Sequence, residues 1–283
     1  MKAAAFDYAR PASLPEALGL LAAHGEAAKL LAGGQSLLPA LNLRLSAPAL
    51  LIDIGRLAAL RGIALRDGVL SIGALTTHAT LRTDTLIAAH APLLARAEAH
   101  IAHPAIRSRG TIGGSLANAD PAAELPACAL VLGARLVMAS TRGERVVAAD
   151  DFFTGLFATA LAPDEILTRI EIDAPSPAAR IGFAELARRE GDYAIVGLAA
   201  CGTAGGAGLS ALRLAFFSVG ATATLARGAA AALTGRPVTG DALRDAEAAL
   251  VTDLAPHDDL QATAATRMTL ARVLLRRVIA EMT

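Results

Sequence analysis

The sequence predicts an α+β protein of two domains. The first 55 residues read as strand, helix and strand, which is a βαβ-like start. Beyond the proline-containing linker at 174–178, three long strand candidates precede three helix candidates, which is typical of an α+β layer. At 283 residues, 54% of them apolar, the chain is long enough for two domains and can bury a sizeable core.

The first part of the chain contains a clear helix start. Ser13 and Glu16 form a capping box, and Pro15 stands in the first turn, where its missing N–H has no cost. The expected elements here are a helix over 14–23, strands over 28–31 and 50–54, and a short helix or turn over 37–45.

The middle of the chain contains two hairpin signals. Arg66-Asp67-Gly68 and Thr141-Arg142-Gly143 each separate two strand-like runs, and Asp-Gly is a strong turn signal. The stretch 103–123, rich in Gly, Pro, Asn and Asp, is expected to be irregular, and a loop of that length is usually functional. The other expected elements are helices over 76–81, 92–100 and 125–132, hairpins over 63–72 and 135–148, and a strand over 166–172.

The part after the linker changes pattern. Its expected elements are strands over 181–186, 195–203 and 209–218, then helices over 221–233, 241–251 and 261–282. Strands followed by helices indicate a second domain.

Composition excludes several classes of function. The net charge is zero, so nothing indicates a nucleic acid or an anionic membrane as a partner. The two cysteines, Cys128 and Cys201, are too few to hold an iron–sulfur cluster, so any such cluster would sit on another chain. The N-terminus meets Asp7 and Arg10 too early for a signal peptide, and the uncharged run 193–212 reads as strand and turn. We therefore expect a cytoplasmic protein without an integral membrane segment.

Two glycine doublets carry most of the functional information. They stand in Ala32-Gly33-Gly34-Gln35-Ser36 and in Thr111-Ile112-Gly113-Gly114-Ser115. Glycine lets a ligand approach the backbone closely, and successive N–H groups in such a turn attract phosphate oxygens. Neither doublet has the spacing of a Rossmann or Walker loop. Two such loops predict a diphosphate held from two sides, and hence a dinucleotide.

The residues around these doublets resemble a known family. The runs AGGQSLLP at 32–39 and RSRGTIGGSLANADPAAELP at 107–126 are similar to the two FAD-binding signatures of molybdenum hydroxylase flavin subunits, such as the medium subunit of aerobic carbon monoxide dehydrogenase. ARREGDYAIVGLAA at 187–200 resembles the start of the family's C-terminal domain. The resemblance implies a vanillyl-alcohol-oxidase-like (PCMH-type) FAD-binding domain over 1–174, with subdomains of about 1–55 and 56–174. It also implies a C-terminal domain over 179–283, with a three-stranded antiparallel sheet and a helical bundle.

The resemblance further implies a set of cofactor-binding residues, with no catalytic residue and no metal ligand in this chain. Asp120 would bond sugar hydroxyls of FAD, although it could instead start a turn before Pro121. Tyr193 would approach the isoalloxazine ring, although a core tyrosine is an alternative. Gln35 could bond the ring, the diphosphate or its own loop. The full set is Ala32, Gly33, Gly34, Gln35, Ser36, Leu37, Thr111, Ile112, Gly113, Gly114, Ser115, Asn118, Asp120, Leu167 and Tyr193.

Family membership would make this chain one subunit of a larger enzyme. A large subunit would carry molybdopterin, and a small subunit two [2Fe–2S] clusters, as a dimer of heterotrimers. FAD here would take electrons from the clusters and pass them to NAD, a quinone or oxygen. Gln35 stands where carbon monoxide dehydrogenase medium subunits tend to have His, which leaves other substrates open. Two alternatives are a self-contained flavin oxidoreductase of the same superfold and a redox-inactive nucleotide-binding module.

Overall fold

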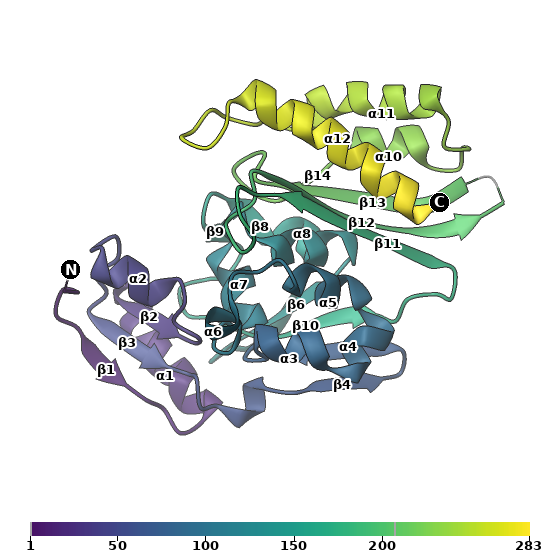
Figure 1. Cartoon of the computed structure of the whole chain (residues 1–283). Coiled ribbons are helices and arrows are strands. Elements are labelled where there is room, and N and C mark those ends of the chain that lie inside the picture. Colours follow the sequence, from purple (N-terminus) through teal and green to yellow (C-terminus); the bar gives the residue numbers. More distant parts are fainter. Residues whose placement is uncertain (1, 207) are drawn as a thin grey trace.

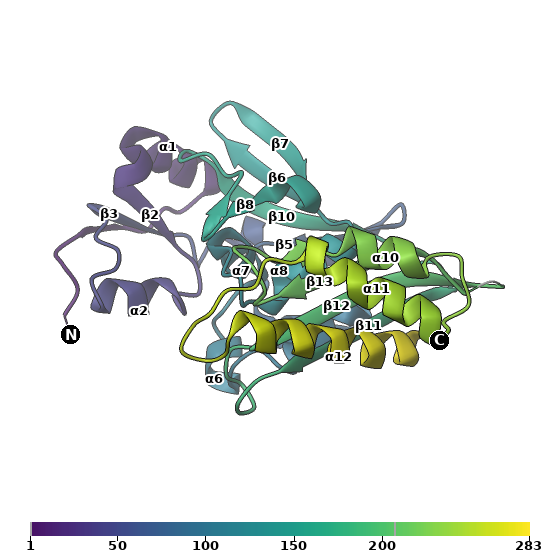
Figure 2. The same ribbon diagram turned by 90° about the horizontal axis from the view of Figure 1, so that it is seen from above.

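The computed structural model describes residues 2–206 and 208–283, arranged in layers (Figure 1). Three helices lie on one face of a four-stranded sheet, and further helices separate its other face from a five-stranded sheet. A three-stranded sheet lies to one side of these layers, as the view from above also shows (Figure 2).

The small sheet at the N-terminus is parallel, with strand order β1-β3-β2. Parallel neighbours need crossover connections, which helices α1 and α2 provide. The prediction of a βαβ-like start is confirmed, whereas the three-residue strand β1 was not predicted. The elements are β1 Asp7–Ala9, α1 Leu14–His24, β2 Ala28–Leu31, α2 Leu37–Asn42 and β3 Leu50–Asp53.

The five-stranded sheet has the order β4-β5-β10-β6-β7 and is antiparallel throughout. Both predicted hairpins are confirmed, and Asp67 and Gly68 at the first turn have φ of 49° and 77°, as a tight two-residue turn requires. The strands are β4 Ile63–Arg66, β5 Val69–Gly73, β6 Arg135–Ser140, β7 Gly143–Ala148 and β10 Ile166–Asp173.

Short helices connect the strands of this sheet in the chain, and several of them pack against it. They are α3 His78–Thr83, α4 Thr85–His90, α5 Pro92–Glu98, α6 Pro104–Arg107, α7 Ile112–Asn118, α8 Glu124–Val131 and α9 Ala149–Phe152. A small hairpin follows α9, formed by β8 Phe153–Gly155 and β9 Ala158–Thr159.

The expectation of an irregular stretch over 103–123 is wrong, because α6 and α7 lie within it. Pro104 opens α6 at its first turn, and the Thr111 hydroxyl caps α7 by accepting a hydrogen bond from the Gly114 N–H at 3.1 Å. The low helix propensity of adjacent glycines concealed α7 in the sequence.

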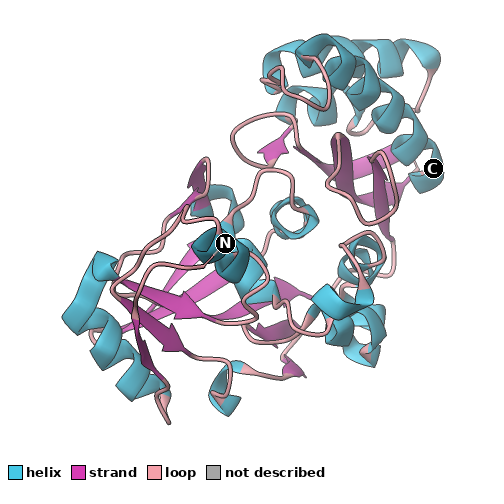
Figure 3. Ribbon diagram, turned by 60° about the vertical axis from the view of Figure 1, so that its left-hand side comes forward, coloured by secondary structure: helices cyan, strands magenta, loops and turns pink. Residues whose placement is uncertain are grey.

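The C-terminal sheet has the order β11-β12-β13-β14. The three long strands were predicted, but the expected three-stranded sheet and the helix start at 221 need correction, because β14 adds a fourth strand before α10 begins. The elements are β11 Ala179–Leu186, β12 Val196–Gly205, β13 Gly208–Phe217, β14 Thr224–Leu225, α10 Arg227–Leu233, α11 Gly240–Asp253 and α12 Ala264–Met282. Figure 3 shows the helices gathered on the outer side of these strands.

Both faces of the C-terminal sheet are buried. One face packs against α10–α12 in a core that includes Leu198 and Phe216. On the other face Phe183 and Phe217 enter the same core as the helices over the five-stranded sheet. The sheet is therefore joined to the N-terminal half by a continuous hydrophobic core, which fixes the residues that the two halves bring together.

Candidate functional site

The first glycine loop connects β2 to α2 and leaves its backbone donors free. Gly34 has φ of 74°, in the left-handed region that favours glycine. Within the described chain, the N–H groups of residues 33–36 donate to no protein acceptor. Gly33, Gly34 and Gln35 are half-buried and Ser36 is exposed, so a ligand can reach these donors. A row of free N–H groups is what an anionic ligand needs.

The two glycine loops are in direct contact. A Cβ on Gly33 would lie 2.2 Å from the carbonyl oxygen of Arg109 and 2.9 Å from the Cα of Gly110. Gly110 in turn packs against His78, where a Cβ would lie 2.5 Å from the imidazole ring. Gly33 is thus required for contact between the loops. The contact brings the loop after β2 against the segment between α6 and α7.

The N–H groups of the second glycine doublet donate to acceptors within the protein, whereas the sequence predicts that they bind phosphate oxygens. The N–H of Ile112 donates to the Thr76 carbonyl at 3.0 Å, and that of Gly113 to the Ala74 carbonyl at 2.9 Å. The Gly114 N–H is taken by Thr111, and a Cβ on Gly113 would lie 2.5 Å from that of Ala74. The backbone donors of 112–114 are therefore satisfied within the protein, which corrects the expectation that they point at the ligand.

Side chains on α7 remain available. Ser115 and Asn118 are three residues apart and so lie on one face of the helix. Both are half-buried, and among the described residues neither side chain makes a hydrogen bond to the protein. Leu167 is buried in β10, next to Thr168, whose carbonyl accepts from the Ala74 N–H at 2.9 Å.

Asp120 and Tyr193 come from the two halves of the chain and meet at the end of α7. One carboxylate oxygen of Asp120 accepts from the Ala122 N–H at 2.9 Å, so Asp120 does form the turn that the sequence left as an alternative. Burial raises the pKa of this carboxyl group, and the Ala122 N–H and the Tyr193 hydroxyl partly oppose the rise. Ala119 just before it has φ of 47°, a conformation that costs a non-glycine residue about 1 kcal/mol.

Tyr193 is 59% exposed, which excludes the alternative of a core tyrosine. Partial burial of its hydroxyl raises the tyrosine pKa, and the neighbouring carboxylates of Asp120 and Glu124 raise it further. Its ring is thus open to a ligand while its hydroxyl end faces Asp120. Gln35 donates from Nε2 to the Gly33 carbonyl at 3.0 Å, so it bonds its own loop.

Buried ionisable groups behind the loops were missed by sequence reasoning. Glu98 is fully buried and pairs with His78, Nδ1 to Oε1, at 2.9 Å. Glu124, at the start of α8, is 8% exposed, and its burial raises its pKa to about 8, with Glu185, Glu98 and Asp120 adding to the rise. Single acidic residues in helices give no sequence signal of such burial.

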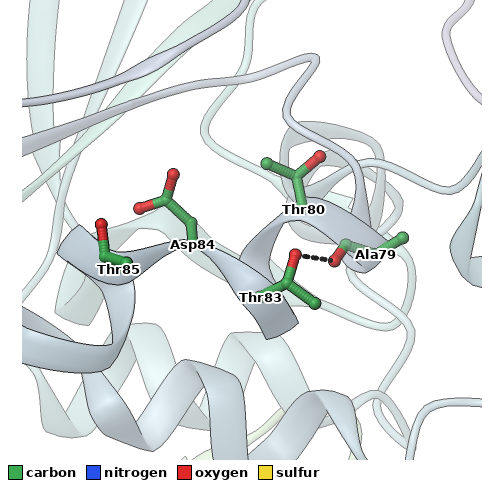
Figure 4. A pocket seen from close by; sticks show the side chains of 5 residues that line it. All are labelled: Ala79, Thr80, Thr83, Asp84 and Thr85. Atoms are coloured by element: carbon green, nitrogen blue, oxygen red, sulfur yellow. Dashed lines mark hydrogen bonds between the residues drawn. The ribbon is translucent and has the colours of Figure 1, made fainter.

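A surface hollow lies apart from these residues. It has a volume of about 490 Å³ and lies at the junction of α3 and α4 (Figure 4). Its lining residues are Ala79, Thr80, Thr83, Asp84 and Thr85. Asp84 is occupied in capping α4, because it accepts from the Leu86 and Ile87 N–H groups. None of the expected cofactor residues lines this hollow.

Residues 4–175 match the family described as the FAD binding domain in molybdopterin dehydrogenase, and residues 181–282 match the CO dehydrogenase flavoprotein C-terminal domain. The chain belongs to the FAD-binding subunits of the molybdopterin dehydrogenases. The prediction of FAD as its cofactor is confirmed, and so are the predicted fold class and the assignment to an FAD-dependent oxidoreductase.

Relatives of this flavin subunit cover nearly its whole length. Caffeine dehydrogenase subunit beta from Pseudomonas sp. (strain CBB1) is 40% identical over 99% of this chain and 95% of the relative. Carbon monoxide dehydrogenase from Hydrogenophaga pseudoflava, in a form lacking the Mo-pyranopterin moiety, has a chain that superposes with a TM-score of 0.97 at 37% identity, covering 100% of this chain and 98% of that one. Quinoline 2-oxidoreductase from Pseudomonas putida 86 superposes with a TM-score of 0.94 at 40% identity, with the same coverage.

Over residues 2–206 and 208–283, no group of three or more His, Cys, Asp or Glu side chains is placed to hold a metal ion. Within the same ranges, no helix combines the length and the apolar character needed to cross a bilayer.

Proposed function

We propose that this flavin subunit holds FAD across its two contacting glycine loops and relays electrons between a partner subunit and a final acceptor. The observation that carries the proposal is the row of free N–H groups at 33–36, held against the second loop by the contact of Gly33 with Arg109. Backbone donors can balance a diphosphate without lysine side chains, and the chain has only Lys2 and Lys29.

Each loop has its own part in this proposal. Residues 32–37 bind the diphosphate through their backbone. From the second loop, Thr111, Ser115 and Asn118 contribute side chains, while Ile112, Gly113 and Gly114 shape the helix start. Asp120 accepts hydrogen bonds from sugar hydroxyls through the oxygen that the Ala122 N–H leaves free. The main chain near Leu167 and the ring of Tyr193 border the isoalloxazine.

Bound FAD can take electrons one at a time and give them up in pairs, and the protein supplies binding and orientation. We propose that the electrons come from [2Fe–2S] clusters on a small subunit, that a large molybdopterin subunit oxidises the substrate, and that the assembly is a dimer of heterotrimers. NAD, a quinone or oxygen receives the electron pair. Medium chains among the relatives support the multi-subunit arrangement. The names of the relatives share no substrate, since they include caffeine, carbon monoxide and quinoline.

We further propose that residues 1–174 fold as the FAD-binding domain, with subdomains of about 1–55 and 56–174, and residues 179–283 as the C-terminal domain. The arrangement of the sheets supports the division. The three-stranded sheet is built from residues 7–53, the five-stranded sheet from 63–173 and the four-stranded sheet from 179–225.

Substitution of Gly33 tests the FAD site. Gly33→Ala places a Cβ 2.2 Å from a backbone oxygen that cannot move freely, so the loops must separate and FAD binding should weaken by at least about tenfold. Gly19→Ala is the matched control, because Gly19 lies exposed in α1 with nothing within 4 Å of a Cβ. Binding is followed by quenching of FAD fluorescence on titration with the chain. Equal affinities of the two variants would refute the proposed site.

Purification of the intact assembly tests the electron path. A tag on this chain should recover a cluster-containing small subunit and a larger molybdenum subunit. If the isolated chain instead oxidises substrate as a stable monomer, it is a self-contained flavin oxidoreductase. If it binds FAD but no reduction follows substrate addition to the assembly, the relay is excluded.

A further inference from the structure

Arg267, in the first turn of α12, is a buried charged residue with an unusual set of partners. It is 3% exposed. Its Nη1 donates to the carbonyl oxygens of Ile195 at 2.5 Å and Ser218 at 2.8 Å, and its Nη2 pairs with Asp259 Oδ2 at 2.5 Å. The pKa of Asp259 is lowered to about 2, first by the Ala262 N–H and also by this guanidinium.

The two carbonyl groups lead directly to the site. Ile195 immediately precedes β12 and lies two residues after Tyr193, whereas Ser218 immediately follows β13. The Ser218 N–H donates to the carbonyl oxygen of Pro121 at 2.8 Å, and Pro121 is the neighbour of Asp120. One guanidinium therefore links the backbone that carries Tyr193 to the backbone that carries Asp120.

Stability alone does not account for this arrangement. Burial of a charged side chain costs free energy, and the carboxylate that pairs with Arg267 belongs to the exposed Asp259, where an ion pair contributes little stability. Here, among the described residues, Arg267 Nε and the Ser218 hydroxyl are buried without any hydrogen-bond partner, and Ser218 has φ of 62° although it is not glycine. Strain and unpaired polar groups persist where a geometry has to be held. Val196 and Val219, the neighbours of the two carbonyl residues, are buried in the core beneath α10–α12.

We propose that Arg267 is a positioning residue that fixes Tyr193 and Asp120 relative to each other at the cofactor. The inference rests on the proposed FAD site. It assigns to α12, which otherwise packs on the outer face of the C-terminal sheet, a part in setting the environment of the flavin.

A double-mutant cycle with Tyr193→Ala, which removes the ring that borders the flavin, tests the proposal in the full chain. Arg267→Met should weaken FAD binding by about tenfold, the factor that corresponds to one lost hydrogen bond to a charged group, and should change the visible circular dichroism of the bound FAD. In the Tyr193→Ala background the same substitution should weaken binding by less than about twofold further, because residues that act together are not additive. Arg276→Met is the matched control, since Arg276 lies on the same helix and pairs with Glu247 at the surface.

A merely structural role predicts equal losses in both backgrounds and an unchanged dichroism spectrum, and that outcome overturns the proposal. If Arg267→Met does not fold, the same measurements on Arg267→Lys decide between the two roles. It keeps the charge but cannot reach two carbonyls and Asp259 together. If the unsubstituted chain binds no FAD, the proposed function fails. If it binds FAD but the effects of the two substitutions on FAD affinity are additive, only this inference fails.

Discussion

Replacing Glu124 with glutamine should change how the stability of the chain depends on pH. Burial raises the pKa of this carboxyl group from 4.5 to about 8. The folded chain therefore keeps a proton that the unfolded chain has released, over the whole interval between these two values. A raised pKa of this kind stabilises the folded state fully below pH 4.5, and the contribution is lost as the pH rises toward about 8.

The size of the effect follows from the shift. Each pH unit within this interval lowers the free energy of unfolding by about 1.4 kcal/mol. Between about pH 5 and about pH 7.5 the wild-type chain should lose roughly 3 kcal/mol from this group alone. Glutamine has nearly the same shape and carries no titrating proton, so this loss should be absent from Glu124→Gln.

Urea unfolding of the full chain at a fixed FAD concentration measures the difference. The wild type and Glu124→Gln should have similar stabilities near pH 5, and the variant should be the more stable of the two near pH 7.5. Glu26→Gln is the control for removing one carboxylate, because Glu26 is exposed. A stability difference between wild type and Glu124→Gln that stays constant across this range would refute the reasoning.

Three other substitutions test the packing around the site. His78→Ala leaves the buried Glu98 without its 2.9 Å partner and should lower the free energy of unfolding by about 3–5 kcal/mol, measured with urea; a loss comparable to a surface substitution would contradict the pairing. Gly197→Ala places a Cβ 1.9 Å from the ring of Phe217, and calorimetry should show a destabilisation of about 1–3 kcal/mol or more. Thr111→Ala removes the cap of α7 and should cost about 1 kcal/mol in the same assay, whereas Thr111→Ser should retain most of it.

Local signals predicted much of the fold. The capping box at Ser13 and the turn at Asp67-Gly68 each depend on neighbouring residues, and both stand where the sequence places them. Strand β1 could not be predicted in this way, because three residues become a strand by pairing with β3, more than forty positions further along the chain. The two-residue strand β14 likewise exists through its pairing with β13.

The candidate site also combines features that the local sequence reveals with features that depend on distant contacts. The glycine doublets are visible in the sequence, and the family resemblance gives the cofactor. The contact of Gly33 with Arg109 is tertiary, and so is the use of the 112–113 N–H groups by Ala74 and Thr76, so neither could be read from spacing. Arg267 is one arginine in a chain rich in arginine, and its burial depends on where two strands end.

The contact between the glycine loops has a consequence for folding. Gly33 follows strand β2 of the parallel sheet, and Arg109 lies between α6 and α7, more than seventy positions further along the chain. The pairing of β2 with β3 needs only residues nearby in the sequence, whereas the meeting of these loops closes a long segment of chain and is expected to come late. A chain whose first sheet has not docked has no complete diphosphate site. FAD would then bind only to chains that have finished folding. The absorbance of bound FAD would therefore measure the amount of fully folded protein.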